Sequence, residues 1–181
     1  WFREQYRDTE KGFKVLGTLH HSVSPFQTMD VLETAHYGRL LVLDGTVQTT
    51  EGDEFIYHEL IAHIPLLAHP APKQVLVIGG GDGGTVREVL KHPGVERVVL
   101  CEIDGDVIDV CRKYLPSISC ALDEPRVEIV VGDGVAYVEQ HPETFDVILN
   151  DSTDPAGPGV GLFTEAFYQN VKRALKKDGI F

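Results

Sequence analysis

Acidic residues stand at the carboxyl ends of successive predicted strands: Asp82, Glu102, Asp133 and Asp151. Parallel strands of one sheet end at a common edge, where ligands of such sheets bind, so we expect these carboxylates to line one cleft. A single aspartate at such a position is more often a helix cap, but four along one edge favour a binding site. Because uncompensated carboxylates are costly in a cleft, this pattern indicates a cationic ligand such as a diamine.

The first of these carboxylates, Asp82, lies inside the glycine-rich run 79–84. The apolar run 75–78 before it predicts a buried strand, and the i, i+3, i+4 spacing in 86–90 predicts a helix after it. This order is typical of the first crossover in a nucleotide-binding α/β sheet. Since a carboxylate repels a pyrophosphate, Asp82 favours a nucleoside that carries positive charge, such as a sulfonium, over a dinucleotide.

Two further acidic residues, Glu102 and Asp133, predict how a nucleoside is bound. Glu102 comes about 20 residues later, where such folds bind a ribose, and a carboxylate there can accept hydrogen bonds from both hydroxyls. Asp133 can accept a hydrogen bond from the amino group of an adenine, while the N–H of Gly134 donates to a ring nitrogen. Asp133 is equally well placed to cap the next helix, and the two roles are compatible.

The loop that follows Asp151 is rich in polar and rigid residues. It holds a second carboxylate, Asp154, and the prolines Pro155 and Pro158. The prolines stiffen the loop and remove backbone donors. A loop that only connected two elements would need neither feature, so we interpret it as part of the site.

The elements that position these residues alternate regularly after Lys73. We predict strands at 75–78, 97–103, 127–131 and 145–149, and helices that start near 85 and cover 104–115, 134–140 and 164–175. This order predicts an α/β fold: a Rossmann-like, doubly wound parallel sheet of the class I methyltransferase kind. Residues 179–181 are typical of the opening of a strand, so we expect the protein to continue beyond residue 181.

The N-terminal part shows no such alternation. The apolar run 40–43 and the run Thr46-Val47-Gln48-Thr49 flank Asp44-Gly45, which predicts a hairpin with a type I′ turn. We therefore expect a small antiparallel β domain at 1–52, which packs on the larger domain or pairs with another subunit. A helix capped by Asp53, with an apolar stripe of Ile56, Leu60, Ile61 and Ile64, and the linker after it make up the connection at 53–72. The expected Rossmann-like, nucleoside-binding catalytic domain follows at 73–181.

Composition narrows the possible functions. The chain has 181 residues and a net charge of −12, with no basic cluster, so nucleic acid is not an expected partner. The negative charge would instead concentrate polycationic substrates. The three cysteines lack metal-ligand spacing and fit a reducing, cytoplasmic location. No apolar run is long enough to span a membrane.

The chain resembles the polyamine aminopropyltransferases, the family that includes spermidine synthases. The resemblance covers essentially the whole chain and is carried by motifs at 43–50, 53–59, 79–84, 101–104, 132–134 and 151–155. It implies transfer of an aminopropyl group from decarboxylated S-adenosylmethionine, a co-substrate, to putrescine. The products are spermidine and 5′-methylthioadenosine, and the resemblance implies a homodimer or homotetramer with no prosthetic group and no metal.

The resemblance also implies roles for individual residues. Asp151 matches the proton acceptor, and Tyr57 matches a tyrosine beside the attacking amine. Residues that match the donor site are Gln27, Gln48, Gly79, Asp82, Glu102, Asp133, Gly134 and Pro158. Residues that match amine contacts are His58, Asp82, Asp151, Ser152, Thr153 and Asp154. In the family, later strands add a glutamine and a tyrosine, which leaves open whether these 181 residues alone are active.

Two alternative functions share some of these sequence features. A putrescine N-methyltransferase shares the scaffold and the glycine and aspartate motifs, but it uses intact S-adenosylmethionine. The carboxylate of that donor would meet Asp82 and Asp151, which argues against it. A non-catalytic polyamine-binding domain is the second alternative.

Overall fold

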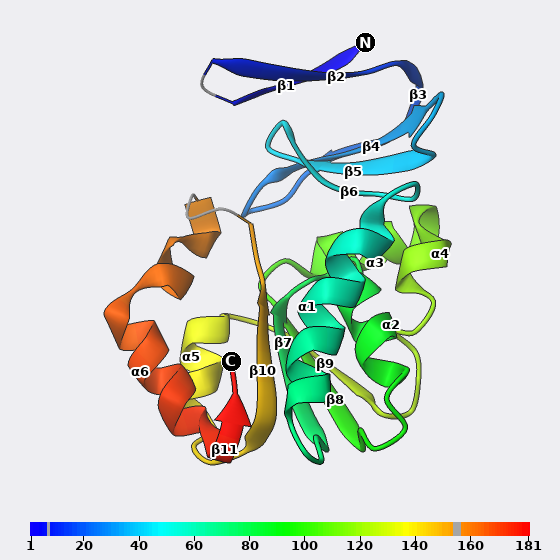
Figure 1. The fold of residues 1–181 in the computed structure, drawn as a ribbon. Coiled ribbons are helices and arrows are strands. Elements are labelled where there is room, and N and C mark those ends of the chain that lie inside the picture. The colour runs from blue at the N-terminus through cyan, green and yellow to red at the C-terminus, as the bar shows by residue number, and fades with distance from the viewer. Residues whose placement is uncertain (7, 154–156) are drawn as a thin grey trace.

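The computed structural model describes residues 1–6, 8–153 and 157–181. Antiparallel strands form the N-terminal part, and they lie above the carboxyl edge of a parallel sheet (Figure 1). The predicted fold class is confirmed: the parallel sheet is flanked by helices, with a small antiparallel β part at the N-terminus.

The N-terminal part contains a two-stranded and a four-stranded antiparallel sheet. The first consists of β1 (Phe2–Tyr6) and β2 (Thr9–Phe13), and the second of β3 (Val15–Val23), β4 (Thr28–Thr34), β5 (Arg39–Leu43) and β6 (Thr46–Thr50). Asp44 and Gly45, between β5 and β6, have φ angles of 47° and 80°. Positive φ at both central residues is what a type I′ hairpin requires.

The parallel sheet has the order β11-β10-β7-β8-β9. Its strands are β7 (Gln74–Gly79), β8 (Arg97–Glu102), β9 (Val127–Val131), β10 (Phe145–Asp151) and β11 (Leu175–Ile180). Central strands such as β7 are almost continuously buried and apolar, because helices cover both faces of the sheet.

Helices pack on each face of this sheet. One face is covered by α1 (Glu54–Ala68), α2 (Gly84–Leu90) and α3 (Gly105–Tyr114), and the short α4 (Pro116–Ser119) follows α3. The other face is covered by α5 (Gly134–Gln140), the 3-10 helix η1 (Gly157–Phe163) and α6 (Glu165–Ala174). Residues of β4 and β5 pack on α3 and α4, which joins the N-terminal part to the sheet domain.

The strand order reverses between β7 and β10. These strands run side by side, and Asp151 at the end of β10 is the register partner of Gly79 at the end of β7. In open α/β sheets, ligands bind at this topological switch point, outside the carboxyl ends of the strands.

The structure corrects three local expectations. Asp53 precedes α1, but its side chain makes no capping hydrogen bond and accepts the hydroxyl of Thr50 at 2.5 Å instead. The stripe predicted on α1 is not its buried face: Ile56, Leu60 and Ile64 are 55–63% exposed, while His58, Ala62 and Leu66 are buried. The last helix ends at Ala174, so β11 begins at Leu175 and not near Gly179.

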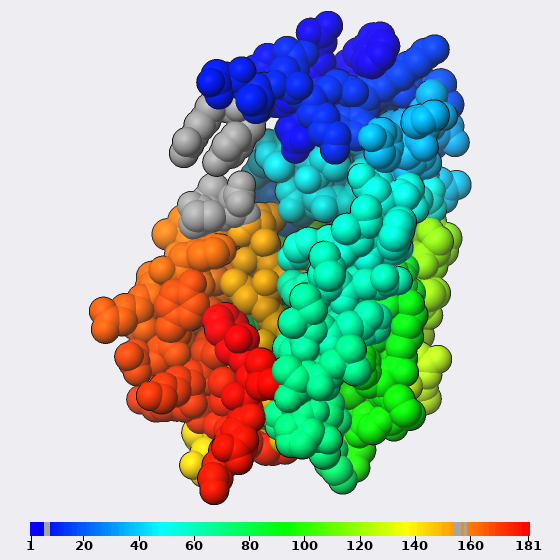
Figure 2. All heavy atoms as spheres, in the orientation of Figure 1, coloured from blue at the N-terminus to red at the C-terminus, as the bar shows by residue number. Residues whose placement is uncertain are grey.

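The C-terminal strand β11 lies beside α1 on the molecular surface (Figure 2). Ile180 and Phe181 line a hollow there together with Leu60 and Ile64. Within the described residues, every helix is too short or too polar to cross a membrane.

Candidate active site

Asp151 lies at the switch point, and the glycine run makes room for it. Gly79 and Gly80 have φ angles of 74° and 68°, which other residues rarely adopt. A Cβ atom on Gly80 would stand 2.6 Å from Oδ2 of Asp151, and one on Gly79 would overlap the backbone carbonyl of Asp151. The close approach of the two strand ends therefore requires glycine at both positions.

Burial raises the pKa of the Asp151 carboxyl group, and the negative charge of Asp82 raises it further. The hydroxyl of Thr85 donates a hydrogen bond of 2.6 Å to Oδ2 of Asp151, and this bond acts in the opposite direction. A carboxylate with a raised pKa accepts a proton more readily, so Asp151 is suited to act as a base.

Tyr57, on the first turns of α1, lies beside Asp151. The residue is 49% exposed, yet burial of its hydroxyl and the neighbouring Asp151 carboxylate raise the pKa of the phenol far above its usual value. The phenol therefore keeps its proton at neutral pH and can donate a hydrogen bond to the Asp151 carboxylate.

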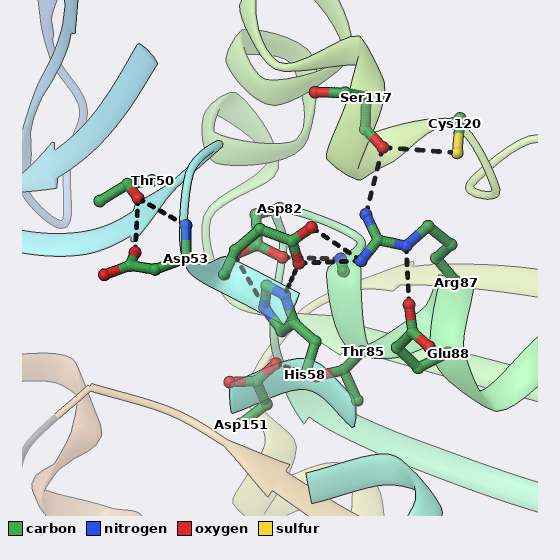
Figure 3. A network of polar contacts seen from close by, with 12 residues as sticks. Thr50, Asp53, His58, Asp82, Thr85, Arg87, Glu88, Ser117, Cys120 and Asp151 are labelled. Carbon is green, nitrogen blue, oxygen red and sulfur yellow. Dashed lines mark hydrogen bonds and ion pairs between the residues drawn. The ribbon is translucent and has the colours of Figure 1, made fainter. Parts of the chain in front are cut away.

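His58 and Asp82 form the other polar centre of the site (Figure 3). The His58 side chain is 3% exposed, and its Nε2 lies 3.5 Å from Oδ2 of Asp82. Its Nδ1 contacts the carboxylate of Glu54, one turn earlier on α1. Burial opposes a charged ring, but Asp82 and Glu54 outweigh it and raise the pKa of His58 to about 9. At neutral pH the ring is therefore an imidazolium.

The predicted nucleoside end of the site lies at the end of β8. Oε2 of Glu102 accepts the N–H of Gly81 at 3.1 Å, and Oε1 accepts the N–H of Asp104 at 3.0 Å. Burial raises the pKa of Glu102 to about 7. Gln27, from the loop before β4, donates from Nε2 to Oδ2 of Asp104 at 3.0 Å, which brings it beside Glu102.

Asp133 and Gly134 lie at the start of α5. Oδ1 of Asp133 caps the helix by accepting the N–H of Val135 at 2.8 Å. Gly134 is buried, and a Cβ atom there would overlap the side chain of Ile78 at the end of β7. Asp133 thus has the cap role that its position allowed, and the close packing at Gly134 brings this turn to the same sheet edge.

A cleft of about 680 Å³ opens between the N-terminal part and the start of α1. Gln48, Tyr57 and His58 line it, together with Glu4 and Lys11 of the β1–β2 hairpin. The structure therefore brings Gln48, predicted for the donor site, into one cleft with the residues predicted to contact the amine.

The loop after β10 is described in part. Oγ of Ser152 is buried and lacks a hydrogen-bond partner among the described residues, as does Oδ1 of Asn150. Ser152 therefore has bonding capacity that a ligand could use. Thr153 is half-buried beside it, while Asp154 and the side chain of Pro158 lie outside the described part of the chain.

Sequence reasoning missed three residues in this region: Glu54, Thr85 and Arg87. Arg87 bonds both oxygens of Glu54 at 2.8 and 2.9 Å, and Thr85 holds Asp151. The i, i+4 spacing of Glu54 and His58 is a signal that could have linked that pair. Among the residues that the structure describes, no cluster of three or more His, Cys, Asp or Glu side chains could hold a metal ion.

Comparison with known proteins gives matches along the whole chain. The model of the spermine/spermidine synthase domain matches residues 54–181, and that of the spermidine synthase tetramerisation domain matches residues 1–51. A polyamine aminopropyltransferase of Thermoanaerobacter sp. (strain X514) is 58% identical over 181 residues, and one of Desulforudis audaxviator (strain MP104C) is 52% identical over 182 residues. These matches cover 99% and 100% of this chain and 65% and 66% of the relatives.

Solved structures agree with these matches. A crystal structure of spermidine synthase in complex with the transition state analogue AdoDATO superposes with a TM-score of 0.97 at 50% identity, covering 99% of this chain and 62% of that one. The spermidine synthase of Thermotoga maritima gives a TM-score of 0.93 at 48% identity, covering 99% and 60%. The chain thus spans less than two thirds of the length of the relatives it matches.

Proposed function

The chain belongs to the spermine/spermidine synthase family, and from that membership we propose that its protein is a spermidine synthase. It transfers the aminopropyl group of decarboxylated S-adenosylmethionine to putrescine. The observation that carries the proposal is the pair of carboxylates, Asp82 and Asp151, at the switch point beside Tyr57 and His58. Two carboxylates in a partly buried cleft favour ligands of positive charge, and both the donor and the acceptor of this reaction are cations.

The donor is proposed to lie across the carboxyl ends of β7, β8 and β9. Glu102 would accept hydrogen bonds from the ribose hydroxyls, with Gln27 beside it, and Asp133 and Gly134 would meet the adenine. The sulfonium and the amino group of the aminopropyl chain would then face Asp82. This placement is supported by the topological switch point between β7 and β10, outside which ligands of such sheets bind.

Transfer begins when the acceptor amine loses a proton, because an alkylammonium has a pKa of about 10.5 and carries no lone pair. Asp151 accepts that proton, and Tyr57 orients the amine. The nitrogen forms a bond to the aminopropyl carbon while the carbon–sulfur bond breaks. Its electron pair stays on sulfur, which leaves 5′-methylthioadenosine and spermidine. Holding the reactants in line supplies most of the rate enhancement.

Other residues would hold the rest of the acceptor. Ser152, Thr153 and Asp154 follow Asp151 in the loop, and the buried Oγ of Ser152 supports a ligand contact there. Gln48 would contact the reactants from the N-terminal side of the cleft. Methyl transfer from intact S-adenosylmethionine is less well supported, since the carboxylate of that donor would be repelled by Asp82 and Asp151.

The deciding experiment is product analysis of the full protein. Putrescine, cadaverine, agmatine and spermidine are each incubated with the protein and decarboxylated S-adenosylmethionine, and in parallel with intact S-adenosylmethionine, and the products are identified by mass spectrometry. We expect spermidine and 5′-methylthioadenosine in equal amounts, formed fastest with putrescine. Methylated putrescine from intact S-adenosylmethionine, or no transfer to any amine, would overturn the proposal.

We also propose the setting in which the enzyme acts. Residues 1–52 form the oligomerisation domain of a homodimer or homotetramer, residues 53–72 the connection, and residues 73–181 the catalytic part. The match of residues 1–51 to a tetramerisation domain supports this division. A cytoplasmic location is supported by Cys101, Cys111 and Cys120, which are free thiols.

A further inference from the structure

A chain of charged contacts links helix α2 to the amine end of the site through α1. Nη2 of Arg87 bonds both oxygens of Glu54, at 2.8 and 2.9 Å. Glu54 contacts Nδ1 of His58, and Nε2 of His58 faces Oδ2 of Asp82 at 3.5 Å. The four side chains are only 3–18% exposed, so solvent screens these interactions weakly.

The orientation of the His58 ring decides its protonation. Each ring nitrogen faces a carboxylate, Glu54 on one side and Asp82 on the other. A neutral imidazole donates from one nitrogen and would direct the lone pair of the other at a carboxylate. Only the doubly protonated ring satisfies both partners. The site therefore contains its own cation before any amine binds.

We propose that Glu54 and Arg87 are positioning residues for aminopropyl transfer: Glu54, clamped by Arg87, orients the His58 ring and retains its proton, so that the ring fixes the Asp82 carboxylate toward the donor. The inference rests on the proposed function for its catalytic consequence. Oδ1 of Asp82 is already held by the N–H of Gly84 at 2.8 Å, and His58 fixes Oδ2. With both oxygens held, Asp82 presents a defined edge to a cationic ligand.

Several charged or titratable groups act on His58 besides Glu54 and Asp82. Asp151 faces it from β10 and favours the charged ring, and Tyr57 adjoins it on α1. Arg87 acts through Glu54, and Glu88 of α2 bonds Nε of Arg87 at 2.9 Å. Because Asp82 and Asp151 stay in place when Glu54 is changed, we expect removal of the Glu54 charge to lower the pKa of His58 without abolishing its titration.

The test uses Glu54→Gln, which preserves size and can still accept a hydrogen bond. Glu59→Gln is the matched control, since it removes the same charge from an exposed position on the same helix. In ¹⁵N NMR titrations of the free protein we expect the acidity of His58 to rise about tenfold in Glu54→Gln, a shift of about one pKa unit, and to stay unchanged in the control. An unaltered His58 titration in a folded Glu54→Gln variant would overturn the inference.

Arg87 provides an independent arm. In Arg87→Met, Glu54 loses its arginine partner but keeps its negative charge next to His58, so the pKa of His58 should not fall. Because Glu54 is no longer clamped, the orientation of the His58 ring is lost. We expect the KM for the donor to rise about tenfold in both Glu54→Gln and Arg87→Met, with partial rescue in Arg87→Lys. Equal falls in the pKa of His58 for Glu54→Gln and Arg87→Met would indicate general loss of structure and contradict the inference.

The two proposals fail separately. If no form of the full protein transfers an aminopropyl group, the proposed function is wrong. The NMR titrations still decide whether Glu54 retains the proton on His58, because they need no substrate.

Discussion

At the scale of single residues, the two carboxylates of the site have different surroundings. Asp82 faces the imidazolium of His58 and accepts a backbone N–H. Asp151 accepts the hydroxyl of Thr85 and lies beside the phenol of Tyr57. Neutral donors stabilise a carboxylate less than a cation does, and this difference suits Asp82 to charge recognition and Asp151 to proton transfer.

Asp151→Asn tests the role of Asp151 as the base. An amide of the same shape cannot accept the ammonium proton, so we expect kcat to fall about 10²- to 10⁴-fold. Binding of 5′-methylthioadenosine, measured by calorimetry, should change little, because the proposed nucleoside contacts are elsewhere. Turnover close to wild type would remove Asp151 from this role.

Thr85→Val tests the hydroxyl that holds Asp151. Thr85 is fully buried, and valine fills the same space without donating. Loss of the bond should raise the pKa of Asp151 further, since the bond counteracts the shift caused by burial. We therefore expect the acid limb of the kcat/KM profile to move to higher pH. Thr85→Ser keeps the hydroxyl and should leave the limb in place; the same shift in both variants would contradict this explanation.

At the scale of elements, α1 shows where sequence reasoning succeeds and where it stops. The strands, the glycine turn and the carboxylates at the strand ends could be predicted, because short apolar β-branched runs followed by glycine or acidic residues indicate buried strands of an α/β sheet. The buried face of α1 could not. Its apolar residues Ile56, Leu60 and Ile64 suggested the packed face, yet His58 is buried. Burial of that face is accompanied by polar pairing with α2, which depends on tertiary packing and not on hydrophobic periodicity.

For the same reason Thr85 and Arg87 could not be assigned from sequence. Each acts through a partner on another element: Arg87 bonds Glu54 across the α1–α2 contact, and Thr85 of α2 bonds Asp151 of β10. The start of the last strand was misjudged for a related reason. Residues 179–181 are typical of the opening of a strand, but Leu175 already pairs with Phe145 in the sheet.

The charged pairing of α1 predicts how stability depends on pH. His58 has a pKa of about 9 in the folded protein and about 6.5 when unfolded, so its contribution is complete below pH 6.5 and is lost as the pH rises through 9. The melting temperature should therefore fall between pH 7 and 10. Thermal unfolding of His58→Gln provides the control: its deficit relative to wild type should shrink across this range, and a constant deficit would disprove the linkage.

At the scale of the whole molecule, the N-terminal part is fixed to the edge that holds the site. The hydroxyl of Ser24 and Nε2 of Gln27 both bond Asp104, at 2.6 and 3.0 Å, and Arg39 donates to the carbonyl of Tyr114 at 2.7 Å. Assembly through this part would therefore also stabilise the nucleoside end of the site.

The proposed assembly can be tested on the exposed face of β3. Leu16 and Val23 are 61% and 70% exposed on a strand with one unpaired edge in the described fold. We expect the double variant Leu16→Glu, Val23→Glu to elute as a smaller species in size-exclusion chromatography with light scattering. Leu67→Glu, which changes an apolar residue on α1 that is 76% exposed, should retain the wild-type size. An unchanged mass for the double variant would place the contact elsewhere.

The pairing of Gly79 with Asp151 also determines when the site can form. The two residues are about 70 positions apart, and β8 and β9 lie between them in the chain but on the far side of β7 in the sheet. During synthesis, the glycine turn leaves the ribosome well before Asp151 does, so the edge of β7 that pairs with β10 stays unpaired until β10 has been synthesised. Such non-local pairing is slow and exposes strand edges to wrong partners. The site can therefore form only after β10 has paired with β7, late in the synthesis of the central strands.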